Sequence, residues 1–248
     1  MSKRLRWVLF YVAFIIFLAA SYGTVVYALG YRYDFMGWKF VRTGSLRVIA
    51  NTSAEIYLNG KLAGKTSFLG DSFSKGQLLP RTYSVRLEKR GYFSWQKNIP
   101  VVAGLFIDIP KVVLLPTELP QEVVATASFG FPLTESKIRP TKGKLLTFDD
   151  HEITVEWLNG TDYQPFKNAG DREVILRTPD LIDDVQWYRD HDHIFVASGG
   201  TLYFHEIDKR GGLNSFPLAS IKEPFYYDAD ENAVFLMEHS EIMKMKLP

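Results

Sequence analysis

A long stretch without charged residues constrains this chain more than any other feature. It runs from Trp7 to Leu29 and follows a basic start made of Lys3, Arg4 and Arg6. As an α-helix the stretch is about 34 Å long, against roughly 30 Å of bilayer hydrocarbon. Because the basic residues precede it, we expect a single-pass helix in the cytoplasmic membrane with a cytoplasmic N-terminus. Residues 30–248 would then lie outside the cytoplasm.

The residues predicted to span the bilayer include Trp7, Phe14, Phe17, Gly23 and Leu29. Aromatic residues near both ends of the stretch are typical of interfacial anchors. A cleaved signal peptide is the alternative, because small residues follow the middle of the stretch. The apolar segment is longer than the roughly 7–15 residues of a signal-peptide core, so we expect a retained signal-anchor.

Charge is distributed unevenly beyond the predicted helix. Residues 44–116 carry ten basic and four acidic residues, a net of +6, whereas residues 117–248 carry 13 basic and 23 acidic residues, a net of −10. A shift of this size predicts a domain boundary near Pro116. The difference in net charge reflects either ordinary variation in composition between two modules or a basic module that faces anionic lipid or an envelope polymer. The absence of cysteine excludes disulfides, thiolate zinc sites and cysteine nucleophiles.

These patterns predict a mainly β protein behind one N-terminal transmembrane helix. The expected segments are a cytoplasmic stub and signal-anchor helix (1–29), a linker (30–43), a small antiparallel β-sandwich (44–116), a connector (117–135) and an acidic β-rich module (136–248).

Alternation of apolar and polar residues predicts the strands of the sandwich. Leu46, Val48 and Ala50 share one face of the first predicted strand. Asn59-Gly60 is a strong hairpin signal, because both residues tolerate positive φ. One apolar face per strand indicates two antiparallel sheets packed against each other over about 70 residues.

Several runs in this region resemble a PEGA domain, namely Gly44–Val48, Ala54–Lys61, Gly64–Thr66, Leu79-Pro80, Tyr83–Val85 and Lys89–Trp95. Where that family has Pro-Glu-Gly-Ala, this chain has Asn51-Thr52-Ser53-Ala54, so only the alanine is kept. The resemblance implies a small extracytoplasmic β-sandwich of the kind found in membrane-anchored bacterial and archaeal surface proteins. It implies no catalytic residues.

Exposed aromatic side chains in this module are candidate ligand contacts, because their rings can stack on sugars. Tyr57 and Tyr92 point away from their apolar neighbours and are the two candidates. Trp95 shares a strand face with Phe93, so we expect it in the core.

Hairpin patterns recur in the acidic module with a regular spacing. At an offset of 40, Ile194–Val196 and Leu202 overlay Val234–Leu236 and Ile242, and at an offset of 49, Leu145, Leu146 and Ile153 precede Ile194, Phe195 and Leu202. A four-stranded unit repeating every 40–50 residues is the period of propeller blades. The run from Val185 to Val196 is similar to blades of the WD-like class. Because only about three blades fit, we expect a β-meander or a partial β-propeller.

Two polar turns in this module could carry chemistry. His191 and His193 lie beside Asp190, and Asp149 and His151 occupy the matching turn of the preceding repeat. A metal site needs about four converging donors, and polar residues are expected in turns anyway. We therefore expect no metal, no cofactor and no catalytic residue.

The leading hypothesis is a non-catalytic membrane-anchored envelope protein that displays a binding module and a β-rich interaction module. Its expected partners are the lipid bilayer, an envelope polymer or surface protein, and a second copy of the chain through the small-residue pair Ala19 and Gly23, but not nucleic acid. The alternative is a membrane-tethered hydrolase or metal-dependent enzyme that uses the His191/His193 and Asp149/His151 turns. A weaker alternative is a sensor subunit.

Overall fold

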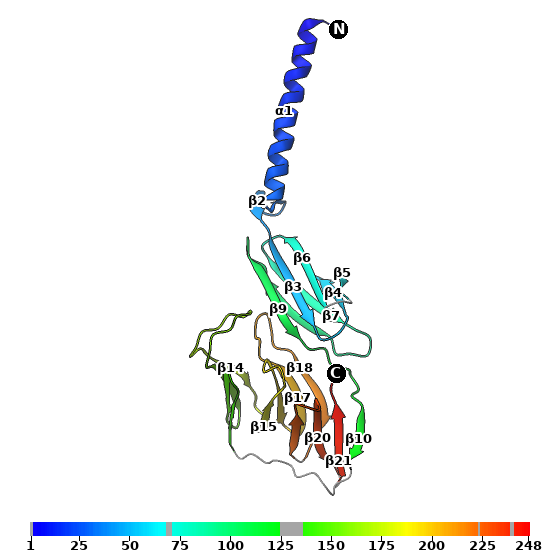
Figure 1. Cartoon of the computed structure of the whole chain (residues 1–248), viewed down its shortest axis with the longest axis vertical. Coiled ribbons are helices and arrows are strands. Elements are labelled where there is room, and N and C mark those ends of the chain that lie inside the picture. Colours follow the sequence, from blue (N-terminus) through cyan, green and yellow to red (C-terminus); the bar gives the residue numbers. More distant parts are fainter. Residues whose placement is uncertain (1, 68–70, 125–135, 223, 239–240) are drawn as a thin grey trace. The chain divides into compact units, whose positions relative to one another are not determined.

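The computed structural model describes residues 2–67, 71–124, 136–222, 224–238 and 241–248 (Figure 1). It is mainly β, with one N-terminal apolar helix and several small antiparallel sheets, as predicted. The chain divides into two compact units. The first comprises residues 1–47, 74–82 and 100–107, and the second comprises residues 48–73, 83–99 and 108–248.

The helix α1 (Lys3–Ala28) begins at an N-cap, where the Ser2 hydroxyl accepts a hydrogen bond from the Leu5 backbone N–H at 3.3 Å. None of its residues is buried, although it has no charged residue from Trp7 onward. Among the described residues it is the one helix with the length and composition to cross a membrane or to serve as a signal sequence. A helix that is apolar on every side and uncovered by protein needs an apolar surrounding.

A hairpin follows the helix after two residues. Its strands are β1 (Tyr31–Asp34) and β2 (Lys39–Arg42), paired from Tyr31 opposite Arg42 to Asp34 opposite Lys39. The segment that the sequence suggested as a plain linker therefore contains regular structure.

Seven further strands form two sheets in the region expected to be a sandwich. One has the order β6-β3-β9, with β3 (Gly44–Ala50), β6 (Ser72–Leu78) and β9 (Phe106–Val112). The other has the order β5-β4-β7-β8, with β4 (Glu55–Leu58), β5 (Lys61–Lys65), β7 (Thr82–Glu88) and β8 (Trp95–Pro100). The predicted inward positions of β3, namely Leu46, Val48 and Ala50, are buried. Asn59 and Gly60 have φ of 50° and 76°, so the predicted turn is confirmed.

Three four-stranded antiparallel sheets make up the rest (Figure 1). The first is β11 (Ile138–Pro140), β12 (Lys144–Phe148), β13 (Glu152–Trp157) and β14 (Arg172–Arg177). The second is β15 (Ile182–Trp187), β16 (His193–Ser198), β17 (Thr201–Glu206) and β18 (Ser215–Ser220). The third joins β19 (Phe225–Asp228), β20 (Ala233–Glu238) and β21 (Glu241–Lys246) to β10 (Gln121–Val124), which pairs with β21.

The strand positions confirm the predicted repeat. Adding 40 to the bounds of β16 and β17 gives the bounds of β20 and β21, and adding 49 to the bounds of β13 gives those of β17. Each of the first two sheets follows chain order, whereas the third takes its outer strand from before the first sheet. Whether the sheets form a propeller stays a prediction.

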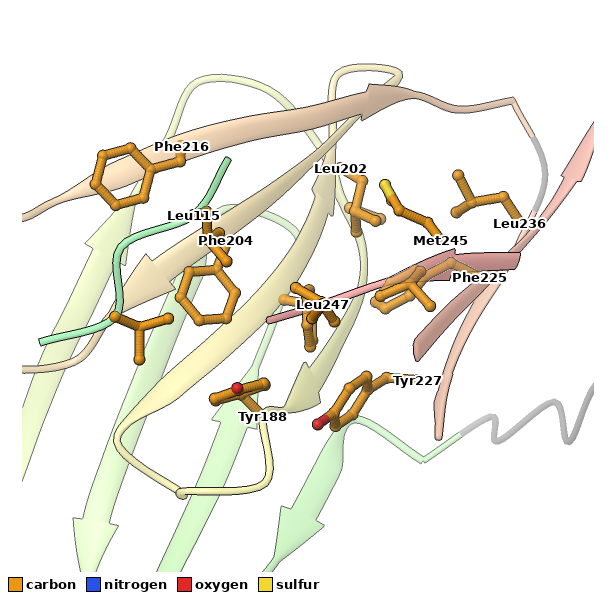
Figure 2. Close-up of a cluster of buried hydrophobic side chains, with 14 residues drawn as sticks. Leu115, Tyr188, Leu202, Phe204, Phe216, Phe225, Tyr227, Leu236, Met245 and Leu247 are labelled. Atoms are coloured by element: carbon orange, nitrogen blue, oxygen red, sulfur yellow. The ribbon is translucent and has the colours of Figure 1, made fainter. Parts of the chain in front are cut away.

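The middle sheet is covered on both faces. One core cluster joins it to the first sheet through residues such as Val155, Trp157, Val185 and Ile194. The other joins it to the third sheet, where Tyr188, Phe204, Phe225 and Tyr227 gather with aliphatic side chains from the neighbouring strands (Figure 2). Every residue of β16 is buried as a result. This explains why its sequence is a continuous apolar run instead of an alternating one.

The segment after β9 departs from the expected course. The sequence predicted a sandwich that extends to Pro116, but its last strand, β9, ends at Val112. Val113 and Leu115 belong to the core cluster of the second and third sheets, and Phe93 packs against the same cluster. Residues 125–135 of the predicted connector and His239 lie outside the described residues.

Candidate functional site

A cluster of buried charged side chains connects β8 to the end of β17 and the segment that follows it. We call it the buried joint; it comprises Lys97, Glu206 and Asp208. Lys97 lies on the inward face of β8, between Trp95 and Ile99, and its side chain is fully buried. Its Nζ atom lies 3.1 Å from Glu206 Oε1 and 3.7 Å from Asp208 Oδ1. A lysine in this position is tolerated only because carboxylates replace the water it has lost.

The Glu206 carboxylate receives two further hydrogen bonds. Trp95 Nε1 donates to Glu206 Oε2 at 3.1 Å, and Asn214 Nδ2 donates to the same oxygen at 3.0 Å. Burial raises the pKa of Glu206, while the charge of Lys97 opposes that rise. Both of its oxygens have partners, and these contacts favour the ionised form of the carboxylate against the effect of burial.

The backbone of β8 lies close to residues 211–214 at the same place. The Asn98 N–H donates to the Gly211 carbonyl at 2.9 Å, and the Gln96 N–H donates to Asn214 Oδ1 at 3.2 Å. A Cβ atom on Gly211 would lie 2.2 Å from the Asn98 carbonyl oxygen, and Gly211 has a φ of 69°. Only glycine fits this position without displacing β8.

A second group of charges gathers around Asp192. Lys144 Nζ lies 2.5 Å from Asp192 Oδ1, and Lys111 Nζ contacts Asp192 Oδ2. The Tyr163 hydroxyl donates to the same carboxylate at 2.8–2.9 Å. Burial lowers the pKa of Lys144, and burial together with the Asp192 charge raises the pKa of Tyr163.

Arg210 also contacts Asp208 and lines the larger of two small cavities. Its guanidinium pairs with Asp208 at 2.7 Å and donates to the Asp108 carbonyl at 3.0 Å. Burial acts to raise the pKa of Asp208, but the hydrogen bond and charge of Arg210 bring it below its usual value. Two neighbouring cavities measure about 70 and 20 Å³. Ligand pockets usually measure about 300–1,000 Å³, so both cavities are smaller than a typical small-molecule pocket.

The predicted ligand contacts Tyr57 and Tyr92 are both half-buried, and Tyr92 lines an open depression. The depression measures about 550 Å³ and is lined by Tyr92 and by Glu55, Lys65 and Lys89 among others. Tyr57 does not line it, but the Tyr57 hydroxyl donates to Glu55 Oε2 at 2.9 Å. The ring of Tyr92 is covered on one side by Lys89, whose Nζ lies 4.2 Å from the ring centroid.

The core position predicted for Trp95 is confirmed, since this side chain is 1% exposed. Its indole N–H reaches Glu206, which accounts for a tryptophan at a position that must be both apolar and hydrogen-bonded.

In the His191/His193 turn, each imidazole ring has a partner within the protein. His193 Nδ1 lies 2.7 Å from Asp190 Oδ2, and the His193 ring stacks on Phe204 with centroids 5.0 Å apart. Burial acts to raise the pKa of Asp190, but the neighbouring His193 lowers it to about 2. His191 instead faces Trp187, with ring centroids 6.1 Å apart.

The Asp149/His151 turn lies on a separate, open depression of about 860 Å³. Asp149 Oδ1 accepts hydrogen bonds from the backbone N–H groups of His151 and Glu152 at 2.9 and 2.8 Å, which lower the pKa of Asp149. Neither His191 nor His193 lines this depression. Within the described ranges, no three His, Asp or Glu side chains are placed to hold a metal ion. The structure therefore does not assemble the two turns into one site.

The predicted membrane-spanning side chains are all outside the protein core. Trp7 is 61% exposed, Phe14 50%, Phe17 64% and Leu29 61%. A Cβ atom at Gly23 would meet nothing within 4 Å.

Sequence reasoning missed the buried charges. A signal was present, because Lys97 falls at the same alternation as Trp95 and Ile99, and Lys144 at the same alternation as Leu146. A lysine on the apolar side of a strand indicates either a snorkelling side chain or a buried ion pair. Comparison of the sequence with models of protein families and with curated proteins finds no match.

Proposed function

We propose that this chain is a non-catalytic, membrane-anchored protein of the cell envelope that holds β-rich binding modules outside the cytoplasmic membrane. The proposal depends mainly on α1, which has no charge between Trp7 and Leu29 and no buried residue. Transfer of such a surface from water into lipid contributes about 25 cal/mol per Å² of apolar area. The three basic residues ahead of it favour a cytoplasmic N-terminus.

Two finer assignments belong to this proposal. The first is that residues 44–116 form a PEGA-like sandwich, supported by the two sheets and by the Asn59-Gly60 turn. The second is that the three C-terminal sheets are propeller-type blades. The 40- and 49-residue offsets and the pairing of β10 with β21 support it, since propellers often complete a blade with a strand from another part of the chain.

The depression beside Tyr92 is the proposed binding surface for an envelope polymer. It presents carboxylates from Glu55 and Glu88 and amines from Lys65 and Lys89 within one open hollow. A polar, open surface with one aromatic wall suits an extended glycan-containing chain better than a compact apolar ligand.

Topology is tested with single cysteines, because the chain has none of its own. Full-length Lys61→Cys and Ser2→Cys variants are expressed in a bacterial host and treated with a membrane-impermeant maleimide. We expect Lys61→Cys to react in intact spheroplasts and Ser2→Cys to react only after permeabilisation, with an uncleaved N-terminus by mass spectrometry. Reaction of both, or a mature chain that begins after α1, would contradict the anchor.

Binding is tested by co-sedimentation of the detergent-solubilised full-length chain with insoluble cell-wall polymer. Tyr92→Ala should weaken retention at least several-fold. Tyr203→Ala, a half-buried tyrosine of β17, serves as the matched control and should retain parental binding. Equal retention of both variants, or no retention of the parent, argues against the depression as the binding surface.

A further inference from the structure

The turn of the β1–β2 hairpin exposes large apolar side chains. Met36 is 84% exposed, Trp38 81% and Phe35 78%, the highest values outside α1 among the large apolar residues that the structure describes. Phe40 on β2 is 64% exposed. Turns in water favour Gly, Asn, Asp, Ser and Pro, and of the four turn residues 35–38 only Gly37 is of this kind, so the other three do not suit an aqueous surrounding.

The backbone at the turn adds a second observation. Trp38 has a φ of 50°, in the left-handed region that bulky residues rarely occupy. The turn is held by the Asp34 carboxylate, whose Oδ1 accepts from the Met36 N–H at 3.2 Å. Burial in the protein does not account for an indole that is strained and 81% exposed, which points to a contact with something else.

The base of the hairpin is joined to the end of α1. Arg32 Nη1 donates to the Tyr27 carbonyl at 3.0 Å, and its guanidinium carbon lies 3.4 Å from the centroid of the Tyr27 ring. Thr43 donates to the Gly30 carbonyl through both its N–H (2.9 Å) and its hydroxyl (2.8 Å). The hairpin therefore begins at the last turn of the helix. Four-residue strands reach only about 13 Å from that point.

A second apolar loop borders the base. Val102 is 47% exposed and Leu105 54%. Gly104 between them donates its N–H to the Thr43 carbonyl at 3.1 Å. Tyr33 of β1 packs its ring against Phe35 and Phe40, with centroids 5.0 and 5.2 Å apart.

We propose that the β1–β2 hairpin is a second membrane contact, with Phe35, Met36 and Trp38 inserted into the interfacial region of the outer leaflet. The inference rests on the proposed membrane anchor, because the bilayer surface lies at Leu29 only if α1 spans the membrane. Aromatic side chains are enriched at this depth, where ring and polar groups are both satisfied. The hairpin would fix the angle at which the first unit leaves the membrane.

The test uses the full-length chain in nanodiscs with an environment-sensitive fluorophore on a single cysteine. The variants are Met36→Cys at the hairpin turn, Lys61→Cys at the exposed β4–β5 turn as the matched control, and Phe17→Cys in the middle of α1. Nitroxide-labelled lipids then report contact with the acyl chains. We expect quenching of Phe17→Cys by the deep nitroxide, quenching of Met36→Cys by the shallow nitroxide, and no quenching of Lys61→Cys.

The outcomes separate the two proposals. If Phe17→Cys is quenched and Met36→Cys behaves like Lys61→Cys, the hairpin inference is wrong and the anchor stands. If Phe17→Cys is not quenched, the anchor itself is wrong. A Trp38→Asn variant provides a second readout, because asparagine tolerates positive φ. This variant should keep its fold but allow trypsin to cleave at Lys39 or Arg42 in nanodiscs at least several-fold faster than in the parent. An unchanged cleavage rate would also refute the inference.

Discussion

Removal of the Lys97 charge tests the buried joint most directly. In Lys97→Met the side chain keeps its length and apolar stem, but Glu206 loses the cation 3.1 Å away. Breaking a buried ion pair by removing one partner costs about 3–5 kcal/mol. For a domain of 150–250 residues this corresponds to a fall in melting temperature of roughly 6–20 °C.

The remaining partners of Glu206 predict the stability of a double variant. Because Trp95 and Asn214 both donate to Glu206 Oε2, a neutral glutamine at 206 keeps an acceptor for them. The double variant Lys97→Met/Glu206→Gln should therefore recover at least half of the lost stability. In the single variant the pKa of Glu206 should rise further, because burial then acts without the lysine. The loss should thus be largest at high pH and shrink as the pH falls.

Stability is measured on the detergent-solubilised full-length chain, by circular dichroism of the β signal and by the emission of buried tryptophans such as Trp95 and Trp157. Arg177→Met removes a surface ion pair to Glu152 and serves as control, with an expected cost of about 0–1 kcal/mol. If Lys97→Met costs no more than Arg177→Met, or if the double variant is no more stable than the single one, the joint does not depend on this pair.

Three further predictions concern other parts of the second unit. Burial lowers the pKa of His205 from 6.5 to about 4. Protonation of His205 therefore favours unfolding as the pH falls through this range. In pH-dependent melts, His205→Leu should remove up to about 3 kcal/mol of this acid-induced loss of stability. Gly211→Ala places a methyl group against the Asn98 carbonyl and should cost at least about 2 kcal/mol in chemical denaturation, whereas Gly143→Ala, with open space around it, should cost less than about 1 kcal/mol. Glu122→Pro removes the N–H of β10 that faces Lys244 and should free the edge of β21, seen as faster amide exchange in β21 and as self-association in light scattering, while Glu122→Gln should change neither.

Local chemistry explains how much of the fold was predictable. Alternation and turn residues predicted the strands of the sandwich sheets, because one buried face per strand imposes a period of two. The continuous apolar run of β16 was still recognisable, since its repeat at 40 residues matched β20. The hairpin at 31–42 was missed, because three of its four turn residues, Phe35, Met36 and Trp38, carry no turn signal.

The buried joint could not be predicted from local patterns. Trp95 and Glu206 are 111 residues apart in the sequence, and alternation says which face a residue takes but not what lies against it. The charge asymmetry was interpreted as drift or as attraction to an anionic surface. The structure gives part of it a third cause, because Lys97 and Lys111 from the basic region pair with Glu206, Asp208 and Asp192 from the acidic one.

The pairing of β10 with β21 has a consequence for biogenesis. The two strands are separated by about 120 residues, so at roughly 5–20 residues per second β10 waits for about 6–24 s during translation before its partner exists. Lys97 waits a comparable time for its carboxylates. In this interval the nascent polypeptide carries an unpaired strand edge and an uncompensated cation, so we expect holdase chaperones to bind it until β21 has been synthesised.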